Sequence, residues 1–264
     1  MRVKLTLAYL GTGFHGWQRQ RAERTVQGEL EATLESLTGR RVVVVGAGRT
    51  DAGVHAAGQV AHLDLVEDIP PPSLVRALNG RLPRDLRVRS ARRVATGFHA
   101  RRSATAKLYV YRVSWRASSL PWVGLRRAVV PPIGDPDALA TAARLLEGRH
   151  DMASFTVTDP SQGPTVRFLH SVRARHSRTG LTLAFLGDGF LRYQVRRMVG
   201  ALLEVGWGRQ SVEDLLRLLI EPTPGAHLWT APAIGLTLEK VLYRSDVDRP
   251  LGVVDPVVDS VVQE

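Results

Sequence analysis

The chain contains the stretch Gly46-Ala-Gly-Arg-Thr-Asp-Ala-Gly-Val-His-Ala-Ala-Gly-Gln-Val-Ala-His62. Apolar residues typical of strands lie on both sides of its centre, at 42–45 and 59–66. Because glycine allows backbone conformations that side chains forbid, we expect a tight loop of defined shape between two strands. Asp51 lies in the middle of this loop, two residues after Arg49. A carboxylate held beside a cation is a candidate for catalysis, although a turn aspartate that bonds its own backbone is a common alternative.

Hydrophobic periodicity around this loop predicts the order β-α-β-β-α-β over the first hundred residues. The first helix begins after the capping residue Thr25 and ends at Gly39, and the second, shorter helix begins at Ser73. The expected strands span residues 3–9, 42–45, 59–66 and 86–95.

The same order of elements partly recurs in the remainder of the chain. The expected strands span residues 107–115, 165–176, 181–186 and 235–243, and the expected helices span 136–147 and 191–205, with another capped by Ser211 and Asp214. We therefore predict an α/β (α+β) fold of two ferredoxin-like, RRM-like split β-α-β halves, whose mixed, largely antiparallel sheets flank a central basic cleft. The predicted domains are 1–103, which carries the aspartate loop, 104–246, which completes the site, and an acidic tail, 247–264.

Composition narrows the functional class. The 264 residues carry a formal net charge of +11, and the basic residues are arginine apart from Lys4, Lys107 and Lys240. Arginine binds phosphate bidentately and stacks on bases, so this excess indicates a nucleic-acid partner and favours RNA. Arg19, Arg21 and Arg24 form one of the candidate RNA-binding clusters. The chain has no cysteine, which excludes disulfides and thiolate metal sites. We expect no membrane span and no secretion signal, and hence a cytoplasmic protein.

Several motifs together resemble the TruA family of tRNA pseudouridine synthases. The loop segment Gly48-Arg-Thr-Asp-Ala-Gly-Val-His-Ala56 resembles that family's catalytic loop. Further matching segments follow in the family's order: Gly16-Trp-Gln-Arg-Gln20, Thr25-Val-Gln27, Phe98-His-Ala-Arg101, Ser103-Ala-Thr-Ala106 and Val195-Arg196. The resemblance implies an isomerase that converts uridines 38, 39 and 40 of the tRNA anticodon stem-loop to pseudouridine. It also implies a homodimer.

The resemblance assigns a role to each candidate site residue. Asp51 is the expected catalytic carboxylate, either as a nucleophile or as a base at C2′. Tyr109 is expected against the uracil face, Arg196 is expected to pair with Asp51, and Phe190 is expected near the pocket. Arg49 is expected to grip a phosphate or to fill the space that a flipped nucleotide leaves. The rearrangement adds and removes no group, so no cofactor is expected.

Two other functions use the same residues. The first is an RNA-binding module on the same fold without catalysis. The second is a metal-dependent RNA hydrolase that uses Asp51, His55 and His62, but their spacing matches no standard metal motif. We therefore predict no metal.

Overall fold

A computed structural model describes residues 1–115 and 124–244. By their internal contacts the described residues divide into two compact units. The first comprises Met1–Thr105 with the stretch that begins at Thr237, and the second comprises Ala106–Leu236. The acidic tail predicted at 247–264 lies outside the described residues. The division into domains at 103/104 stays a prediction.

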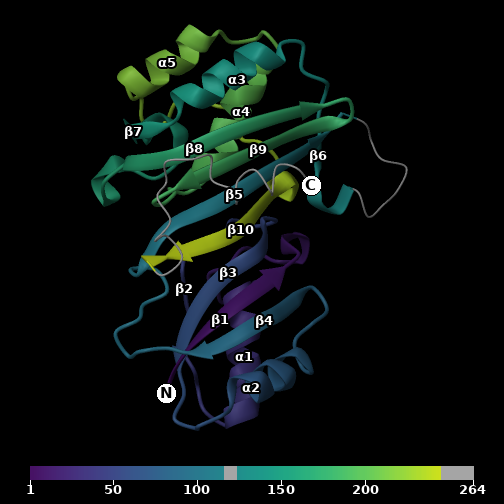
Figure 1. The fold of residues 1–264 in the computed structure, drawn as a ribbon, viewed down its shortest axis with the longest axis vertical. Coiled ribbons are helices and arrows are strands. Elements are labelled where there is room, and N and C mark those ends of the chain that lie inside the picture. The colour runs from purple at the N-terminus through teal and green to yellow at the C-terminus, as the bar shows by residue number, and fades with distance from the viewer. Residues whose placement is uncertain (116–123, 245–264) are drawn as a thin grey trace. The chain divides into compact units, whose positions relative to one another are not determined.

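The first unit has the expected order of elements (Figure 1): β1 (Arg2–Tyr9), α1 (Val26–Thr38), β2 (Val45–Gly46), β3 (His55–Asp64), α2 (Pro71–Asn79) and β4 (Leu86–Arg93). Strand β1 pairs antiparallel with both β3 and β4, and β2 pairs antiparallel with β3. The resulting order β4-β1-β3-β2 places the first and third strands at the centre, as the ferredoxin-like prediction requires.

Helix α1 begins and ends where its capping residues predict. The Thr25 side chain accepts a hydrogen bond from the Gly28 amide, and Gly39 ends the helix in the left-handed conformation at φ 68°. Leu30 and Leu34 of α1 are fully buried, as are Leu74 and Leu78 of α2. These leucines and the alternate apolar residues of β1 form the core of this unit.

The strand predicted at 42–45 is almost absent, because only Val45 and Gly46 pair as β2. Side chains of α1 satisfy the preceding backbone instead. Glu31 Oε1 accepts from the Val44 amide at 3.1 Å, and Gln27 Nε2 donates to the Val44 carbonyl at 3.1 Å. Both side chains are buried, so this stretch needs no neighbouring strand to satisfy its polar groups.

The last strand, β10 (Leu236–Tyr243), which we expected to close the second half, pairs in parallel with β3 of the first unit. Thr237 lies opposite His55, and Leu238 lies opposite Ala56. Gly58 permits this approach, because a Cβ there would overlap the Glu239 carbonyl oxygen. The identity of a strand's partner depends on such tertiary contacts, which periodicity does not reveal.

In the second unit, strands run in the order β5-β9-β8-β7, and the short strand β6 (Ala128–Val129) pairs in parallel with β5. The long strands are β5 (Ala104–Ser114), β8 (Val166–Ser177) and β9 (Gly180–Gly187), and β7 (Gly148–Asp151) is short. Periodicity missed β6 and β7, which are two and four residues long. Helix α3 (Pro136–Leu145) contacts β8, α4 (Gln194–Gly206) and α5 (Val212–Ile220), as Figure 1 shows. Ser211 and Asp214 form the predicted capping box of α5.

The fold class is confirmed as mixed α and β with largely antiparallel strands. Within the described residues, parallel pairing is recorded for β3 with β10 and for β5 with β6. Across residues 1–115 and 124–244, no helix combines the length and apolar character needed to cross a bilayer.

Candidate active site

The glycine-rich segment forms the loop between β2 and β3. The exposure of its residues alternates: Arg49 is exposed, Thr50 is buried and Asp51 is half-buried. The Asp51 carbonyl accepts from the Val54 amide at 3.1 Å, and Gly53 adopts a φ of +80°. The loop therefore turns tightly just after Asp51, as the glycine spacing predicts.

A second segment, residues 11–17, supports this loop along its length. The Trp17 amide donates to the Thr50 carbonyl at 3.0 Å, and the Gly53 amide donates to the Phe14 carbonyl at 3.3 Å. Gly16, at φ +90°, lies so close that a Cβ would be 2.7 Å from the Thr50 oxygen. Backbone contacts on both sides of Asp51 thus restrain the position of its main chain.

Buried polar side chains also hold the loop through hydrogen bonds. The Tyr9 hydroxyl lies 2.9 Å from Thr50 Oγ1, and Gln59 Nε2 donates to the Gly48 carbonyl at 2.9 Å. Burial raises the pKa of Tyr9 to about 12, so its phenol stays protonated at neutral pH. Neither Tyr9 nor Gln59 was predicted as a functional residue. Their signal in the sequence was weak, since a tyrosine and a glutamine in strands are usually read as packing.

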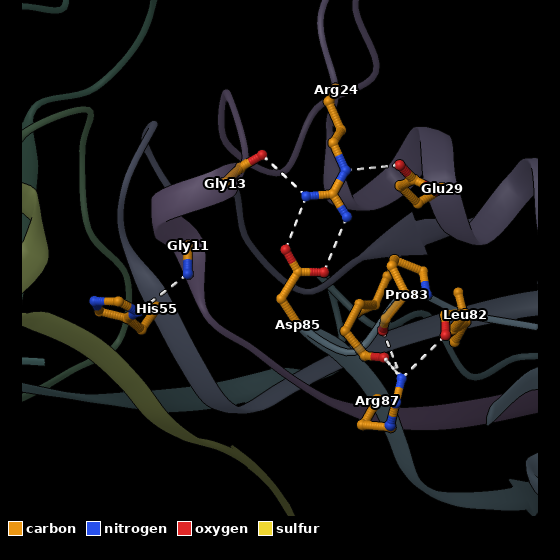
Figure 2. Close-up of polar contacts among 10 residues, drawn as sticks. Gly11, Gly13, Arg24, Glu29, His55, Leu82, Pro83, Asp85 and Arg87 are labelled. Atoms are coloured by element: carbon orange, nitrogen blue, oxygen red, sulfur yellow. Dashed lines mark hydrogen bonds and ion pairs between the residues drawn. The ribbon is translucent and has the colours of Figure 1, made fainter. Parts of the chain in front are cut away.

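Figure 2 shows how the 11–17 segment is itself fixed. The Arg24 guanidinium binds both carboxylate oxygens of Asp85, at 2.8 and 2.9 Å, and Nε donates to Glu29 at 2.9 Å. Arg24 Nη1 also donates to the Gly13 carbonyl at 3.2 Å. Arg24, which the sequence predicts as an RNA contact, thus also bonds within the chain and supports the segment that holds the loop.

The interaction between Arg24 and Asp85 should appear as a coupling energy in the free energy of unfolding. Arg24→Lys is expected to lower the free energy of unfolding by about 1 kcal/mol, because lysine cannot make the bidentate contact and the pair is partly exposed. Urea unfolding of Arg24→Lys, Asp85→Asn and the double variant measures the coupling. Strictly additive effects would contradict this role, and Arg93→Lys, in the more exposed pair with Asp68, is the matched control.

The histidines of the metal hypothesis each have a ring nitrogen engaged with the backbone. His55 Nδ1 accepts from the Gly11 amide at 3.0 Å (Figure 2), and His62 Nδ1 accepts from the Ala100 amide at 3.2 Å. Among the described residues, no group of three or more histidine or acidic side chains is placed to hold a metal ion. Both histidines therefore act as structural hydrogen-bond acceptors for backbone amides.

His62 makes stability depend on pH. Burial first, and then the nearby His99 and Arg2 cations, lower its pKa below 6.5, with Asp64 opposing them. The unfolded chain therefore binds the proton more readily. The contribution of His62 to stability is complete above about pH 6.5 and is lost as pH falls through the lowered pKa.

We expect His62→Gln to flatten the fall in stability below pH 6.5, because its amide oxygen accepts from Ala100 without titrating. Urea midpoints between pH 4.5 and 7.5 measure this. The exposed His176→Gln is the control, and parallel curves for wild type and His62→Gln would contradict the assignment.

The other predicted site residues lie in the second unit. The Tyr109 ring meets Phe190 edge to face at 5.2 Å, and the Tyr109 side chain is buried. Arg196, half-buried on α4, donates from Nε to the Ala231 carbonyl at 2.7 Å, and its guanidinium lies 5.1 Å from the Tyr193 ring centre. Tyr193 has a φ of 61°, an uncommon conformation for a non-glycine residue. Tyr111 is fully buried and donates to the Pro232 carbonyl, consistent with a structural role.

The site residues thus form two groups: Arg49 and Asp51 in the first unit, and Tyr109, Phe190 and Arg196 in the second. The first group combines a restrained carboxylate with an exposed cation. The second combines two aromatic rings with an arginine. These are groups suited to stacking a base and to acid–base chemistry, as in enzymes that modify nucleic acid.

Comparison with known proteins agrees with that class. A family model described as tRNA pseudouridine synthase matches residues 6–101 and 142–244. A tRNA pseudouridine synthase A of Limosilactobacillus fermentum is 42% identical over 249 residues, which cover 92% of this chain and 96% of that protein. The tRNA pseudouridine synthase A of Solidesulfovibrio magneticus is 44% identical, over 92% of this chain and 91% of that protein. That of Maridesulfovibrio salexigens is 42% identical, over 92% of this chain and 90% of that protein.

The chain therefore belongs to the tRNA pseudouridine synthase family. It is an enzyme of the isomerase class, and its substrate is tRNA. The resemblance inferred from the loop motif is confirmed.

Proposed function

We propose that this synthase converts uridines 38, 39 and 40 of the tRNA anticodon stem-loop to pseudouridine, with Asp51 as the catalytic carboxylate. The observation that supports Asp51 best is the immobilised loop. Backbone bonds from Thr50, Asp51 and Gly53 fix its shape, and a half-buried carboxylate lies between the buried Thr50 and the tight turn. Such a group is oriented before substrate binds, which lowers the cost of reaching the transition state.

In the proposed reaction the C1′–N1 bond of the uridine breaks and the base turns. A C1′–C5 bond then forms, C5 loses its proton and N1 gains one, so atoms balance without a co-reactant. The Asp51 carboxylate acts either as the nucleophile on the nucleoside or as the base at C2′. Tyr109 stacks on the uracil, and its hydroxyl assists the proton transfer at C5.

The remaining site residues hold the substrate and the carboxylate. Arg196 pairs with Asp51 and favours its ionised form. Arg49 is exposed, and it grips a phosphate or occupies the space left by the extruded nucleotide. Phe190, in contact with Tyr109, forms the side of the base pocket. These roles join the two predicted halves, 1–103 and 104–246, in one active site.

The proposal includes a cytoplasmic location and a homodimer, and the homodimer rests on the family resemblance. Light scattering of the purified protein tests the dimer, with an expected mass of about twice the 29.0 kDa of one chain. A single-chain mass in the presence and absence of tRNA would remove the dimer from the proposal.

The uridine positions are tested with tRNA transcripts tritiated at uracil C5. Forming the C1′–C5 bond expels that hydrogen, so each turnover releases tritium into water. We expect release from a transcript with uridine at 38, 39 and 40, and loss of release when cytidine replaces all three. Release that continues undiminished from the cytidine transcript would place the modified uridine elsewhere.

A further inference from the structure

A pocket of about 520 Å³ lies in the second unit near the end of α4. Its lining includes Trp207, Arg209 and Gln210 from the end of α4 and the segment after it, and Trp229 from the segment before β10. None of the proposed site residues lines it. The aromatic and polar character of this pocket is not used by the proposed reaction.

Two neighbouring tryptophan rings form one wall of the pocket. The Trp207 and Trp229 ring centres are 5.6 Å apart and their planes are tilted by 48°. The Arg209 guanidinium lies 4.7 Å from the Trp207 ring centre, and Trp229 remains 40% exposed. Exposed tryptophan beside arginine is a surface on which nucleobases stack, because every base has a π-face and the guanidinium adds a cation–π contact.

One residue of the lining carries an unsatisfied acceptor. Gln210 Oε1 is buried and has no hydrogen-bond partner among residues 1–115 and 124–244. A buried acceptor without a donor costs free energy, so such groups often mark a ligand position. Amino and imino groups on the edge of a nucleobase are donors of the required kind.

The main chain connects this pocket to the proposed active site. Trp229 packs its carbonyl so closely on Gly200 that a Cβ there would overlap it, and Ala231 exchanges hydrogen bonds with Arg196. Trp207, the C-cap of α4, lies eleven positions after Arg196, a rise of about 16 Å. A segment of a few nucleotides of single-stranded RNA is long enough to span that distance.

We propose that this pocket binds an unstacked nucleobase of the tRNA substrate, a base other than the uridine that reacts. The base stacks on Trp229 and donates a hydrogen bond to Gln210. The site rests on the proposed function, since it assumes that the bound polymer is tRNA. It adds affinity and orientation and takes no part in bond breaking.

The test compares Trp229→Leu with Trp229→Tyr by fluorescence anisotropy of labelled, unmodified tRNA transcript. We expect Trp229→Leu to raise the Kd about tenfold and Trp229→Tyr to stay close to wild type, because tyrosine stacks and leucine does not. The matched control is Trp115→Leu, a tryptophan in the same unit that packs on His176. Equal Kd values for the Leu and Tyr variants would overturn the proposal.

Gln210→Met separates a ligand role from a structural one. Removing an unsatisfied buried acceptor is expected to leave stability unchanged or to increase it, while the Kd for tRNA rises severalfold. An unchanged Kd would overturn the hydrogen bond to the base. If Trp229→Leu lowers the affinity for tRNA and also changes the mass of the protein in solution, this face is an interface between copies of the chain. That result would overturn the nucleobase site.

Tritium release keeps this proposal distinct from the proposed function. Absence of release from wild type would contradict the proposed function. Wild-type release together with an unchanged Kd in Trp229→Leu would contradict the nucleobase pocket alone.

Discussion

Replacing Asp51 with asparagine is expected to reduce tritium release from C5-labelled tRNA by roughly 10⁴-fold or more, with tRNA affinity nearly unchanged. Asparagine has almost the same shape and leaves the bonds from the Asp51 backbone to Val54 in place. It is neither an effective nucleophile nor a base, so the loss would come from the chemical step. The measurement is single-turnover tritium release at saturating protein, with chelator present.

The matched control is Asp68→Asn, which makes the same chemical change at an exposed aspartate paired with Arg93. Its turnover should equal that of wild type. Equal release from Asp51→Asn and wild type would show that another group is the catalyst. Tight tRNA binding by wild type without release from several tRNAs would favour the non-catalytic RNA-binding module, and loss of release caused by chelator would revive the metal-dependent alternative.

Gly16→Ala is expected to have the second largest effect, although residue 16 bears no chemistry. The methyl group would lie 2.7 Å from the Thr50 oxygen, and alanine is strained at φ +90°. We expect a loss of roughly 2 to 4 kcal/mol in the free energy of unfolding. Because the displaced atoms belong to the loop that carries Asp51, the proposed catalytic carboxylate, single-turnover release should fall by about 10²-fold in the protein that remains folded.

The control for Gly16→Ala is Gly39→Ala. Gly39 also has positive φ, at +68°, but no atom lies within 4 Å of an added Cβ. Only the backbone strain of about 1 kcal/mol applies there, and activity should be retained. If both variants lose the same stability and both retain activity, close packing of Gly16 on Thr50 does not position Asp51.

Local sequence signals predicted much of this chain because their causes are local. Thr25 and Gly39 delimit α1, and Ser211 with Asp214 begins α5, since each cap is satisfied within a few residues. The loop around Asp51 was predicted because glycine spacing determines which backbone conformations are open. The synthase family was recognised from the same loop.

Long-range contacts account for the errors. Val42–Val45 has the composition of a strand, yet Gln27 and Glu31 of the preceding helix α1 satisfy the backbone of Val44. Strand β10 has the alternation of apolar and polar residues that predicts a strand. Its pairing with β3, however, requires glycine at position 58, where a Cβ would overlap the Glu239 carbonyl. The ion pair of Arg24 with Asp85, 61 residues away, was likewise not predictable from sequence spacing.

The sequence alone was sufficient for the α+β class, the helix ends, the loop that carries Asp51 and the family, because each is encoded by neighbouring residues or by a specific motif. The tertiary structure was needed to show what holds that loop. Tyr9, Gly16, Gln59 and Arg24 act through contacts that span from 11 to 61 residues. Sequence spacing does not determine such contacts, since they form only when helices and strands pack into one core.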